Sequence, residues 1–456
     1  MSSKDGAKKP EALASGIESK FERIRAGGAS VGIIGMGYVG LPLALTASDA
    51  GFPVVGFDLD DAKVRALNEG SSYITHIAPE KVAGALNSGH FRATADFEEL
   101  RQAEIILICV PTPLTPQREP DMSYVKSTAE RVASKLNPGQ LVILESTTYP
   151  GTTADLVRPI LEGGDLSSGR DFFLAYSPER EDPGNPEFST KRIPKVVGGD
   201  GDTALALAVA FYEQIVPSVI PVSSTGTAEA VKLTENIFRA VNIALVNELK
   251  VIYDAMGIDV WEVIEAAKTK PFGYMPFYPG PGLGGHCIPI DPFYLTWKAR
   301  EYEVPTRFIE LAGEVNAAMP HYVVEKLVAS LNDHAGKGLK GARVLIVGVA
   351  YKKNIDDTRG SASFKIIRLL QDRGAEVLYH DPYVPVLPVT RDHPLLGSMT
   401  SEVWGEALFA NLDAALILTD HDGIDYQALV ERCPLLIDTR NATARFDPVP
   451  ENVIKA

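Results

Sequence analysis

Residues Ser30–Asp58 read SVGIIGMGYVGLPLALTASDAGFPVVGFD. An apolar strand leads into the turn Gly35-x-Gly37-x-x-Gly40, which opens a helix, and Asp58 ends the next strand 23 residues after Gly35. In such a turn the first glycine allows the bend, the second lets the backbone approach a pyrophosphate, and the third permits close packing of helix on strand. The stretch predicts a parallel α/β sheet that binds a dinucleotide.

The acid after the second strand indicates which dinucleotide is bound. A carboxylate at Asp58 accepts hydrogen bonds from a ribose diol and repels a 2'-phosphate, which favours NAD over NADP. Thr112 ends a later strand on the same edge of the sheet and is a candidate contact, although a proline-stiffened loop without a ligand explains it as well. The expected cofactor contacts are Gly35, Gly37, Tyr38, Val39, Gly40, Asp58, Lys63, Thr112 and Thr147.

Two parts of the chain alternate short β-branched runs with helix-length segments, a pattern typical of parallel sheets covered on both faces. Between them, residues 227–253 contain no proline or glycine and predict one long helix, followed by a Pro/Gly-rich loop over 271–289 and a helical stretch over 304–319. The predicted strands are 31–34, 54–57, 105–110, 141–145 and 195–197 in the first part, and 344–347, 376–379, 414–418 and 435–437 in the second.

We therefore predict an α/β fold with two Rossmann-like, doubly wound parallel-sheet domains joined by a central long-helix segment. The expected divisions are a mobile or weakly helical tail (1–28), an NAD-binding domain (29–222), a central helical segment (223–325) and a second Rossmann-like domain (326–456). The second domain starts like the first, with ARVLIVGVAY, but keeps only Gly348 in its turn. It is expected to bind something other than a dinucleotide pyrophosphate, or nothing.

Composition narrows the class of protein. The 456 residues are 45% hydrophobic and 23% charged, which excludes collagen-like, disordered and coiled-coil proteins. A net charge of -15 argues against nucleic-acid and anionic-membrane partners. No apolar run approaches the roughly 18 residues that span a bilayer, and the N-terminus has no apolar signal region, so we expect a soluble protein that is not exported.

Three widely spaced cysteines, Cys109, Cys287 and Cys433, form neither a disulfide framework nor a metal-binding CxxC pair, so we expect a reduced cytoplasmic location and no metal. Cys287 lies in the stretch 280–291, GPGLGGHCIPID. Four glycines bring backbone and a small nucleophile close to a ligand. An inert thiol more often sits inside an apolar strand, as Cys109 does, so Cys287 is a candidate nucleophile, with Asp291 four residues later.

Other polar residues remain open to two interpretations. Lys232 and Asn236 lie one turn apart on the predicted long helix, and a buried lysine there is either a structural ion pair or a functional group; spacing alone favours the ion pair. The segments 146–151 and 177–180 follow strands, where turn chemistry and ligand binding are equally good explanations. Lys352 and Arg359 follow the first strand of the second domain and suit a diphosphate or a solvated loop.

Taken in order, these motifs resemble the UDP-glucose/GDP-mannose dehydrogenase family over about residues 31–445. The matching segments are GMGYVGLPLA, FDLD, VPTPLT, ESTTYPGTT, SPERED, AEAVKLTEN, GPGLGGHCIPIDP and VAYKKNIDDTR. The forms around the cysteine are most similar to the branch that oxidises UDP-N-acetylglucosamine at C6 for surface polysaccharide precursors. Ile290 replaces a lysine that is common in other relatives, so no role of that lysine carries over.

The resemblance implies oxidation of the C6 hydroxymethyl of a UDP-sugar to a carboxylate with two NAD+. Cys287 matches the nucleophile that forms a thiohemiacetal and then a thioester. Lys232 and Asn236 match residues that stabilise an oxyanion and hold a water. Asp291 matches an aspartate associated with proton transfer, Glu179 a carboxylate for thioester hydrolysis, and Thr147 a residue that positions the water.

The same resemblance implies a UDP-binding second domain and a homodimer or higher homo-oligomer that uses the long helix. The expected substrate contacts are Glu179, Arg180, Lys232, Asn236, Gly284, Lys352 and Arg359. Three alternatives remain open. The same chemistry could act on UDP-GalNAc, UDP-ManNAc or UDP-glucose; Cys287 could be inert in a two-electron alcohol or hydroxyacid dehydrogenase; or the chain could be a nucleotide sensor with a decayed site.

Overall fold

The computed structural model describes residues 8–74, 77–115, 117–180, 193–285, 288–390 and 393–456. The chain forms two compact units. Unit 1 comprises Met1–Glu235 and Phe293–Glu303, and unit 2 comprises Asn236–Pro292 and Val304–Ala456. Two of the three boundaries between the units fall inside helices α8 (Thr225–Ala255) and α10 (Asp291–Ala299), and the third lies between Glu303 and Val304.

Unit 1 contains an eight-stranded sheet in the order β3-β2-β1-β4-β5-β6-β7-β8. Its strands are β1 (Val31–Ile34), β2 (Val54–Phe57), β3 (Phe91–Thr94), β4 (Ile105–Ile108), β5 (Leu141–Leu144), β6 (Phe173–Tyr176), β7 (Lys195–Gly199) and β8 (Val219–Val222). The first six positions follow the strand order of dinucleotide-binding sheets, with the order reversing between β1 and β4. All neighbouring strands are parallel except β6 and β7, which are antiparallel, so the predicted Rossmann-like parallel-sheet fold is confirmed with one reversed strand pair.

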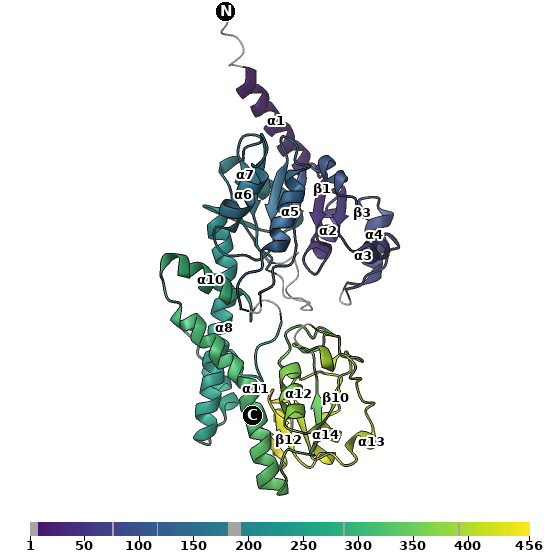
Figure 1. The fold of residues 1–456 in the computed structure, drawn as a ribbon, viewed down its shortest axis with the longest axis vertical. Coiled ribbons are helices and arrows are strands. Elements are labelled where there is room, and N and C mark those ends of the chain that lie inside the picture. The colour runs from purple at the N-terminus through teal and green to yellow at the C-terminus, as the bar shows by residue number, and fades with distance from the viewer. Residues whose placement is uncertain (1–7, 75–76, 116, 181–192, 286–287, 391–392) are drawn as a thin grey trace, which may run out of the picture. The chain divides into compact units, whose positions relative to one another are not determined.

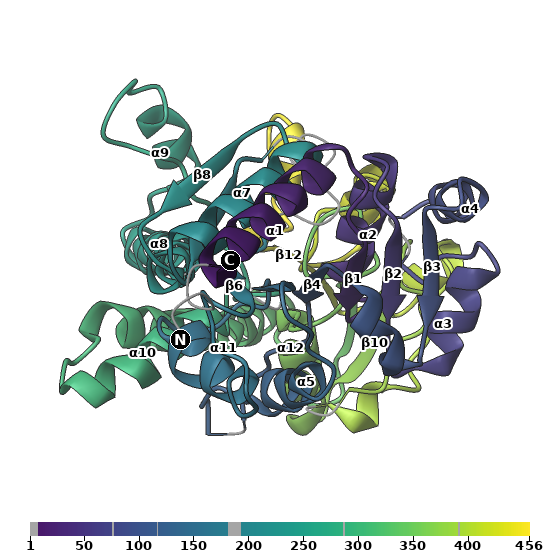
Figure 2. The ribbon, with the colours of Figure 1, turned by 90° about the horizontal axis from the view of Figure 1, so that it is seen from above.

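Helices cover both faces of this sheet, because the central strands are apolar on both sides and must be buried on both. One face packs against α1, α2 and α7, and the other against α5 (Figure 2). Helix α6 packs on the same face as α5. The helical elements are α1 (Lys8–Arg25), α2 (Gly40–Asp49), α3 (Asp61–Asn68), α4 (Pro79–Asn87), η1 (Phe97–Gln102), α5 (Ser123–Ala133), η2 (Thr152–Val157), α6 (Arg158–Leu161), α7 (Asp202–Ile215) and η3 (Arg300–Tyr302).

The first described residues form a packed helix, which corrects the expectation of a mobile or weakly helical tail. Ile17, Phe21 and Ile24 recur at helical spacing, so they form one apolar stripe on α1. Ile24 is fully buried, and Ile17 and Phe21 pack against the same core cluster. This stripe docks α1 onto α7.

Unit 2, in which Figure 1 labels strands β10 and β12, contains a five-stranded, wholly parallel sheet in the order β10-β9-β11-β12-β13. Its strands are β9 (Arg343–Val347), β10 (Glu376–His380), β11 (Ala414–Ile417), β12 (Leu436–Asp438) and β13 (Val453–Lys455). Its other elements, beside the second part of α8, are α9 (Val260–Ala267), α11 (Arg307–Ala335), α12 (Ala362–Asp372), η4 (Pro394–Leu396), α13 (Glu406–Phe409), α14 (Tyr426–Arg432) and η5 (Ala442–Arg445). The order reverses between β9 and β11, where open α/β sheets bind ligands.

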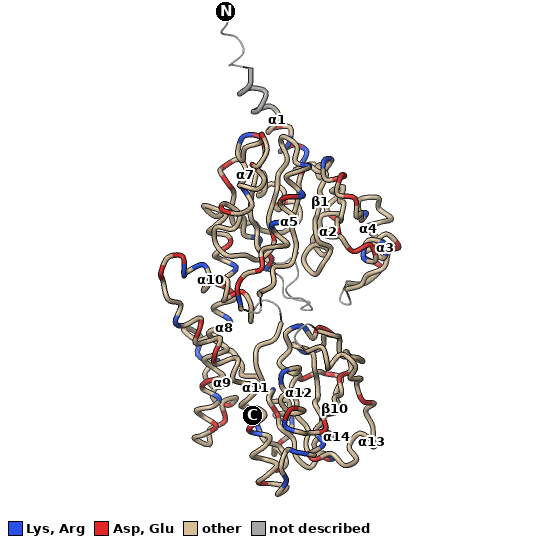
Figure 3. The backbone as a smooth tube through the Cα atoms, in the orientation of Figure 1, with Lys and Arg blue, Asp and Glu red and all other residues tan. Residues whose placement is uncertain are grey.

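The two long helices differ in how well the sequence predicts them. The predicted long helix is confirmed as α8, whereas α11 runs well past the expected end and continues through Pro320 to a left-handed Gly336. Acidic and basic positions are interspersed over both units (Figure 3). No helix in the described ranges combines the length and apolar character needed to span a membrane.

Candidate active site

The glycine turn of unit 1 leaves room for a ligand at one glycine and none at the other two. Gly35 has φ of +94°, and a Cβ there would lie 2.7 Å from the Cys109 carbonyl oxygen. A Cβ at Gly40 would lie 1.9 Å from the Gly35 oxygen, whereas no atom lies within 4 Å of a Cβ built at Gly37. Val39 supplies no side-chain cap to α2. The open space at Gly37 and the helix N-terminus therefore suit a pyrophosphate.

Asp58 is held beside this turn. Its Oδ2 accepts the Met36 N–H at 3.0 Å, and its Oδ1 accepts the Asp60 N–H at 3.0 Å. The ammonium of Lys63 lies 3.5 Å from Oδ2. The structure thus brings two predicted cofactor residues, Asp58 and Lys63, to the turn, and Tyr38 lies within it, about one-third exposed.

Tyr73 also contacts the turn and was not predicted. Its hydroxyl donates to the Met36 carbonyl, and its ring lies 5.8 Å from the Lys63 ammonium. Burial, and then the charges of Asp58 and Asp60, raise the pKa of Tyr73, so its hydroxyl stays protonated. No motif marks Tyr73, because it lies in a loop beyond α3 that only the fold returns to the turn.

Asp58→Ala is expected to raise the KM for NAD about 10- to 100-fold, the equivalent of one or two charged hydrogen bonds. The KM for the sugar and the rate at saturating NAD should change little. Steady-state kinetics with each substrate varied in turn measures this, and Asp61→Ala, an exposed acid on the same loop and helix, is the control. An unchanged response to NAD would show that the ribose does not contact Asp58.

The loops after β4 and β5 are tied together at the ligand edge of the sheet. The Thr112 hydroxyl donates to the Thr147 carbonyl at 2.8 Å, and Ser146 donates to the Val110 carbonyl at 2.7 Å. Tyr294, at the start of α10, donates to the Thr112 carbonyl at 2.5 Å. The two predicted residues Thr112 and Thr147 are therefore neighbours, and Thr112 already uses its hydroxyl hydrogen within the protein.

Lys232 lies on α8 and is 7% exposed. Within the part of the chain that the structure describes, no ion pair or hydrogen bond of its ammonium is found. Glu229, one turn earlier, accepts the Gly151 N–H at 2.6 Å and the Thr153 N–H at 2.8 Å. Burial raises the pKa of Glu229 to about 7. Glu229 thus ties α8 to the loop that carries Thr147.

Glu179 and Arg180 follow β6. Arg180 pairs with Glu235 at 2.6 Å and donates to the Pro194 carbonyl at 2.6 Å. The carboxylate of Glu179 lies 3.9 Å from the ammonium of Lys195, a residue that the sequence analysis did not predict. Residues 181–182 of the SPERED motif lie outside the described residues.

In unit 2, Asn236 and Asp291 meet although 55 residues separate them. The Asn236 side-chain amide donates to Asp291 Oδ2 at 2.5 Å, and both side chains are buried. Asn236 comes from α8 and Asp291 begins α10. The predicted nucleophile Cys287 lies outside the described residues.

The glycines before residue 286 pack against the loop that follows β9. A Cβ at Gly284 would lie 2.7 Å from the Tyr351 Cβ, and the Gly285 N–H donates to the Arg359 carbonyl at 3.1 Å. The guanidinium of Arg359 forms a two-point contact with Asp357, at 2.8 and 2.6 Å. Glycine is required here because the two backbones approach this closely.

Arg440 is a cation that the sequence analysis missed. Its Nε donates to the Leu418 carbonyl at 2.9 Å, and its Nη1 lies 2.6 Å from where a Cβ at Gly280 would stand. No described residue accepts a hydrogen bond from its two outer nitrogens. Burial lowers the pKa of Arg440 to about 10, against the charges of Asp420 and Asp438. The sequence did not mark Arg440 as a candidate, because a single arginine after a strand belongs to no recognisable binding motif.

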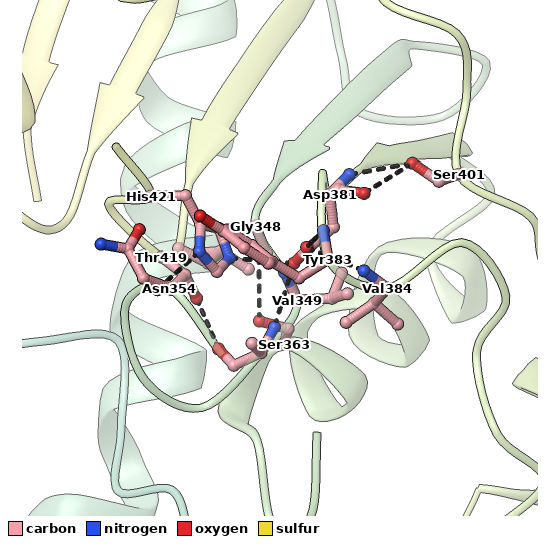
Figure 4. A network of polar contacts seen from close by, with 12 residues as sticks. Gly348, Val349, Asn354, Ser363, Asp381, Tyr383, Val384, Ser401, Thr419 and His421 are labelled. Carbon is pink, nitrogen blue, oxygen red and sulfur yellow. Dashed lines mark hydrogen bonds and ion pairs between the residues drawn. The ribbon is translucent and has the colours of Figure 1, made fainter. Parts of the chain in front are cut away.

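The turn of the second sheet is filled by the protein's own groups (Figure 4). Asp381 follows β10 as Asp58 follows β2, but it is fully buried. Its Oδ2 accepts the Val349 N–H at 2.7 Å and lies 3.1 Å from His421 Nε2. Its Oδ1 accepts the N–H groups of Tyr383 and Val384. Since His421 Nδ1 accepts the Asn354 N–H at 2.9 Å, Nε2 carries the ring hydrogen. Both oxygens of the Asp381 carboxylate are therefore occupied by hydrogen bonds within the protein, so this carboxylate is not available to a ribose.

Three consecutive parts of the chain match models of one protein family. Residues 29–216 match the NAD binding domain of the UDP-glucose/GDP-mannose dehydrogenase family, residues 226–318 its central domain, and residues 345–445 its UDP binding domain. The chain belongs to the UDP-glucose/GDP-mannose dehydrogenase family. Membership makes it an oxidoreductase with an NAD-binding domain, which confirms the expected family, class of enzyme and cofactor.

Relatives in this family bear names that differ in the sugar. The UDP-N-acetyl-D-glucosamine 6-dehydrogenase of Pseudomonas aeruginosa is 37% identical over 78% of this chain and 83% of its own. The NDP-N-acetyl-D-galactosaminuronic acid dehydrogenase of Ralstonia nicotianae is 34% identical over 90% of this chain and 95% of its own. The solved structure of the UDP-D-ManNAc dehydrogenase from Pyrococcus horikoshii has a TM-score of 0.83 and 32% identity, over 93% of this chain and 98% of that one.

Proposed function

We propose that this protein oxidises the C6 hydroxymethyl of a UDP-sugar, with UDP-N-acetylglucosamine the first choice, to the uronic acid. The observation that carries the proposal is the buried ammonium of Lys232, which no acid among the described residues neutralises. A fixed, unpaired donor of this kind is suited to an oxygen that gains negative charge during the reaction. We place the enzyme in the cytoplasm, in the supply of surface polysaccharide precursors.

The residues around the glycine turn fit NAD. Gly37 leaves open space for the pyrophosphate, α2 offers uncapped N–H groups, and Asp58 presents a carboxylate for a ribose diol. NAD supplies, when bound, an acceptor for the hydride in each of the two oxidations. Because Asp58 is held by two backbone donors, its carboxylate is already in position before a ligand binds.

The chain's own residues divide the chemistry into steps. The alcohol loses a hydride and a proton to give an aldehyde, and Lys232 and Asn236 stabilise the oxygen. The thiol of Cys287 adds to the aldehyde carbon, and loss of a second hydride and a proton leaves a thioester. Water, positioned by Thr147 and deprotonated by Glu179, attacks the thioester and releases the acid and the thiol. Asp291, hydrogen-bonded to Asn236, takes part in proton transfer.

Unit 2 supplies the groups for the UDP moiety. Lys352 and Arg359 lie in the loop after β9, beside the loop that contains Gly284. Arg440 follows β12, and no described residue pairs with its two outer guanidinium nitrogens. These cations provide local positive charge for a diphosphate in a chain of net charge -15. We propose that they contact the diphosphate, together with the substrate contacts Glu179 and Arg180.

The protein is proposed to act as a homodimer. Phe238, Leu245 and Ile252 recur every seven residues along α8, and each is about half exposed. Phe308 and Leu311 of α11 are also exposed. Such an apolar stripe on a long helix suits packing against a second helix.

The function is tested by following NADH formation with UDP-GlcNAc, UDP-GalNAc, UDP-ManNAc and UDP-glucose. We expect two NADH per sugar and the highest kcat/KM with UDP-GlcNAc. If another of the four sugars gives the highest kcat/KM, that sugar is the substrate and the proposed reaction is unchanged. One NADH per sugar would support a two-electron dehydrogenase in which Cys287 is inert, and binding without any NADH would support a sensor.

A further inference from the structure

The antiparallel pair β6–β7 brings a lysine to the ligand edge of the unit 1 sheet. Tyr176 pairs with Gly198, and the same register, continued beyond β6, places Glu179 opposite Lys195. The Ser177 hydroxyl donates to the Val196 carbonyl at 2.8 Å, so the two segments stay in contact beyond the last paired residues. Had β7 been parallel to β6, its first residue would lie at the opposite edge of the sheet.

Lys195 is held from behind by a fully buried acid. Its ammonium lies 2.6 Å from Glu145 Oε2, and the Tyr212 hydroxyl donates to the other oxygen of Glu145. Glu145 directly follows β5 and Tyr212 comes from α7. Lys195 itself is 5% exposed, so its charge lies in the protein interior and not on the surface.

The charged and titratable groups that face this ammonium are Glu145, Glu179, the Cys109 thiol and Tyr212, whose ring centroid lies 5.3 Å from it. Burial lowers the pKa of Lys195, but the two carboxylates outweigh burial and leave the pKa raised, so the ammonium stays charged. Burial, and then Glu145, raise the pKa of Tyr212, while burial is the largest influence that raises the pKa of Glu145. The Lys195 ammonium therefore interacts with two carboxylates, that of the fully buried Glu145 and that of the more exposed Glu179.

We infer that Lys195, anchored by Glu145 and Tyr212, is a positioning residue that holds the Glu179 carboxylate for thioester hydrolysis. The inference rests on the proposed function. In that step the water oxygen bonds to the thioester carbon, Glu179 takes the water proton, and the carbon–sulfur bond breaks to release the Cys287 thiolate. The Lys195 ammonium, 3.9 Å from the Glu179 carboxylate, restrains that carboxylate during the step.

The test separates hydrolysis from the two oxidations. Lys195→Met is combined with Glu145→Gln, so that no unpaired carboxylate stays buried. The first-turnover rate of NADH formation should stay within about threefold of the wild type, while steady-state turnover falls about 10- to 100-fold, as expected for impaired general-base catalysis. Acylated Cys287 should accumulate, detected by mass spectrometry after rapid quenching.

Two further variants keep the result interpretable. Lys195→Arg retains the cation and should restore steady-state turnover to within about tenfold of the wild type. Tyr212→Phe removes one hydrogen bond to Glu145 and should raise the amount of acylated Cys287, though less than the double variant does. This variant provides the test if the double variant does not fold. Slow turnover without acylated Cys287 in the folded variants would overturn the role of Lys195. The absence of NADH with any UDP-sugar in the wild type would instead contradict the proposed function.

Discussion

Cys287→Ser is expected to bind NAD and UDP-sugar but to lose acid production by at least about 1,000-fold. An aldehyde has no second hydride to give until a nucleophile adds to its carbonyl carbon, and a serine hydroxyl is a far weaker nucleophile than a thiolate at neutral pH. Stopped-flow measurement of NADH, with product analysis by mass spectrometry, distinguishes a stall after one oxidation from a stall at an ester stage.

Cys433→Ala is the matched control for that experiment. Cys433 is buried in unit 2 beside α14, and burial raises its thiol pKa to about 12, so it is not a nucleophile at neutral pH. Its replacement should leave turnover close to the wild-type value. Wild-type acid production by Cys287→Ser, without an adduct on the protein, would remove the covalent route.

Lys232→Met is expected to lower kcat about 100- to 1,000-fold with little change in the KM for the sugar. The magnitude is that of removing one preorganised donor to an oxyanion. Because the Lys232 ammonium lacks an ion pair among the described residues, its removal leaves none of their acids uncompensated, and we expect the variant to fold. Steady-state kinetics together with thermal unfolding measures both effects.

Lys250→Met supplies the comparison. Lys250 is another buried lysine of α8, and burial, the largest influence on it, lowers its pKa. It lies five turns further along the helix, away from Asn236 and Asp291. Its replacement should leave kcat near the wild-type value. Equal losses from both substitutions would mean that Lys232 acts only through the stability of α8.

The parts of the site that follow local rules were predicted well. The turn at Gly35, Gly37 and Gly40 and the acid at Asp58 depend on spacing within one strand–helix–strand unit, where a short chain segment sets the geometry. The long helix α8 was also predictable, because the stretch contains no helix-breaking proline or glycine and is far longer than a typical strand. The roles of Cys287, Lys232 and Asp291 came from the family resemblance, and they stay predictions.

Contacts between distant segments were not predictable. Tyr73 returns to the glycine turn, Arg440 reaches Gly280, and Asn236 meets Asp291 only because segments far apart in the chain are folded onto one another. The packing of α1 was missed for a related reason. Its stripe of Ile17, Phe21 and Ile24 is short, and its stability comes from the core that it covers.

The amino-acid sequence by itself determined two α/β sheets, the dinucleotide turn of the first and the long helix after it, since each depends on residues near one another in the chain. Tertiary structure alone decided that β7 is antiparallel to β6, which places Lys195 opposite Glu179. It also decided that neighbouring groups occupy the hydrogen-bonding positions of Asp381, whereas Asp58 stays accessible to a ligand. Strand direction and the saturation of a buried carboxylate depend on long-range packing, which no local pattern of residues encodes.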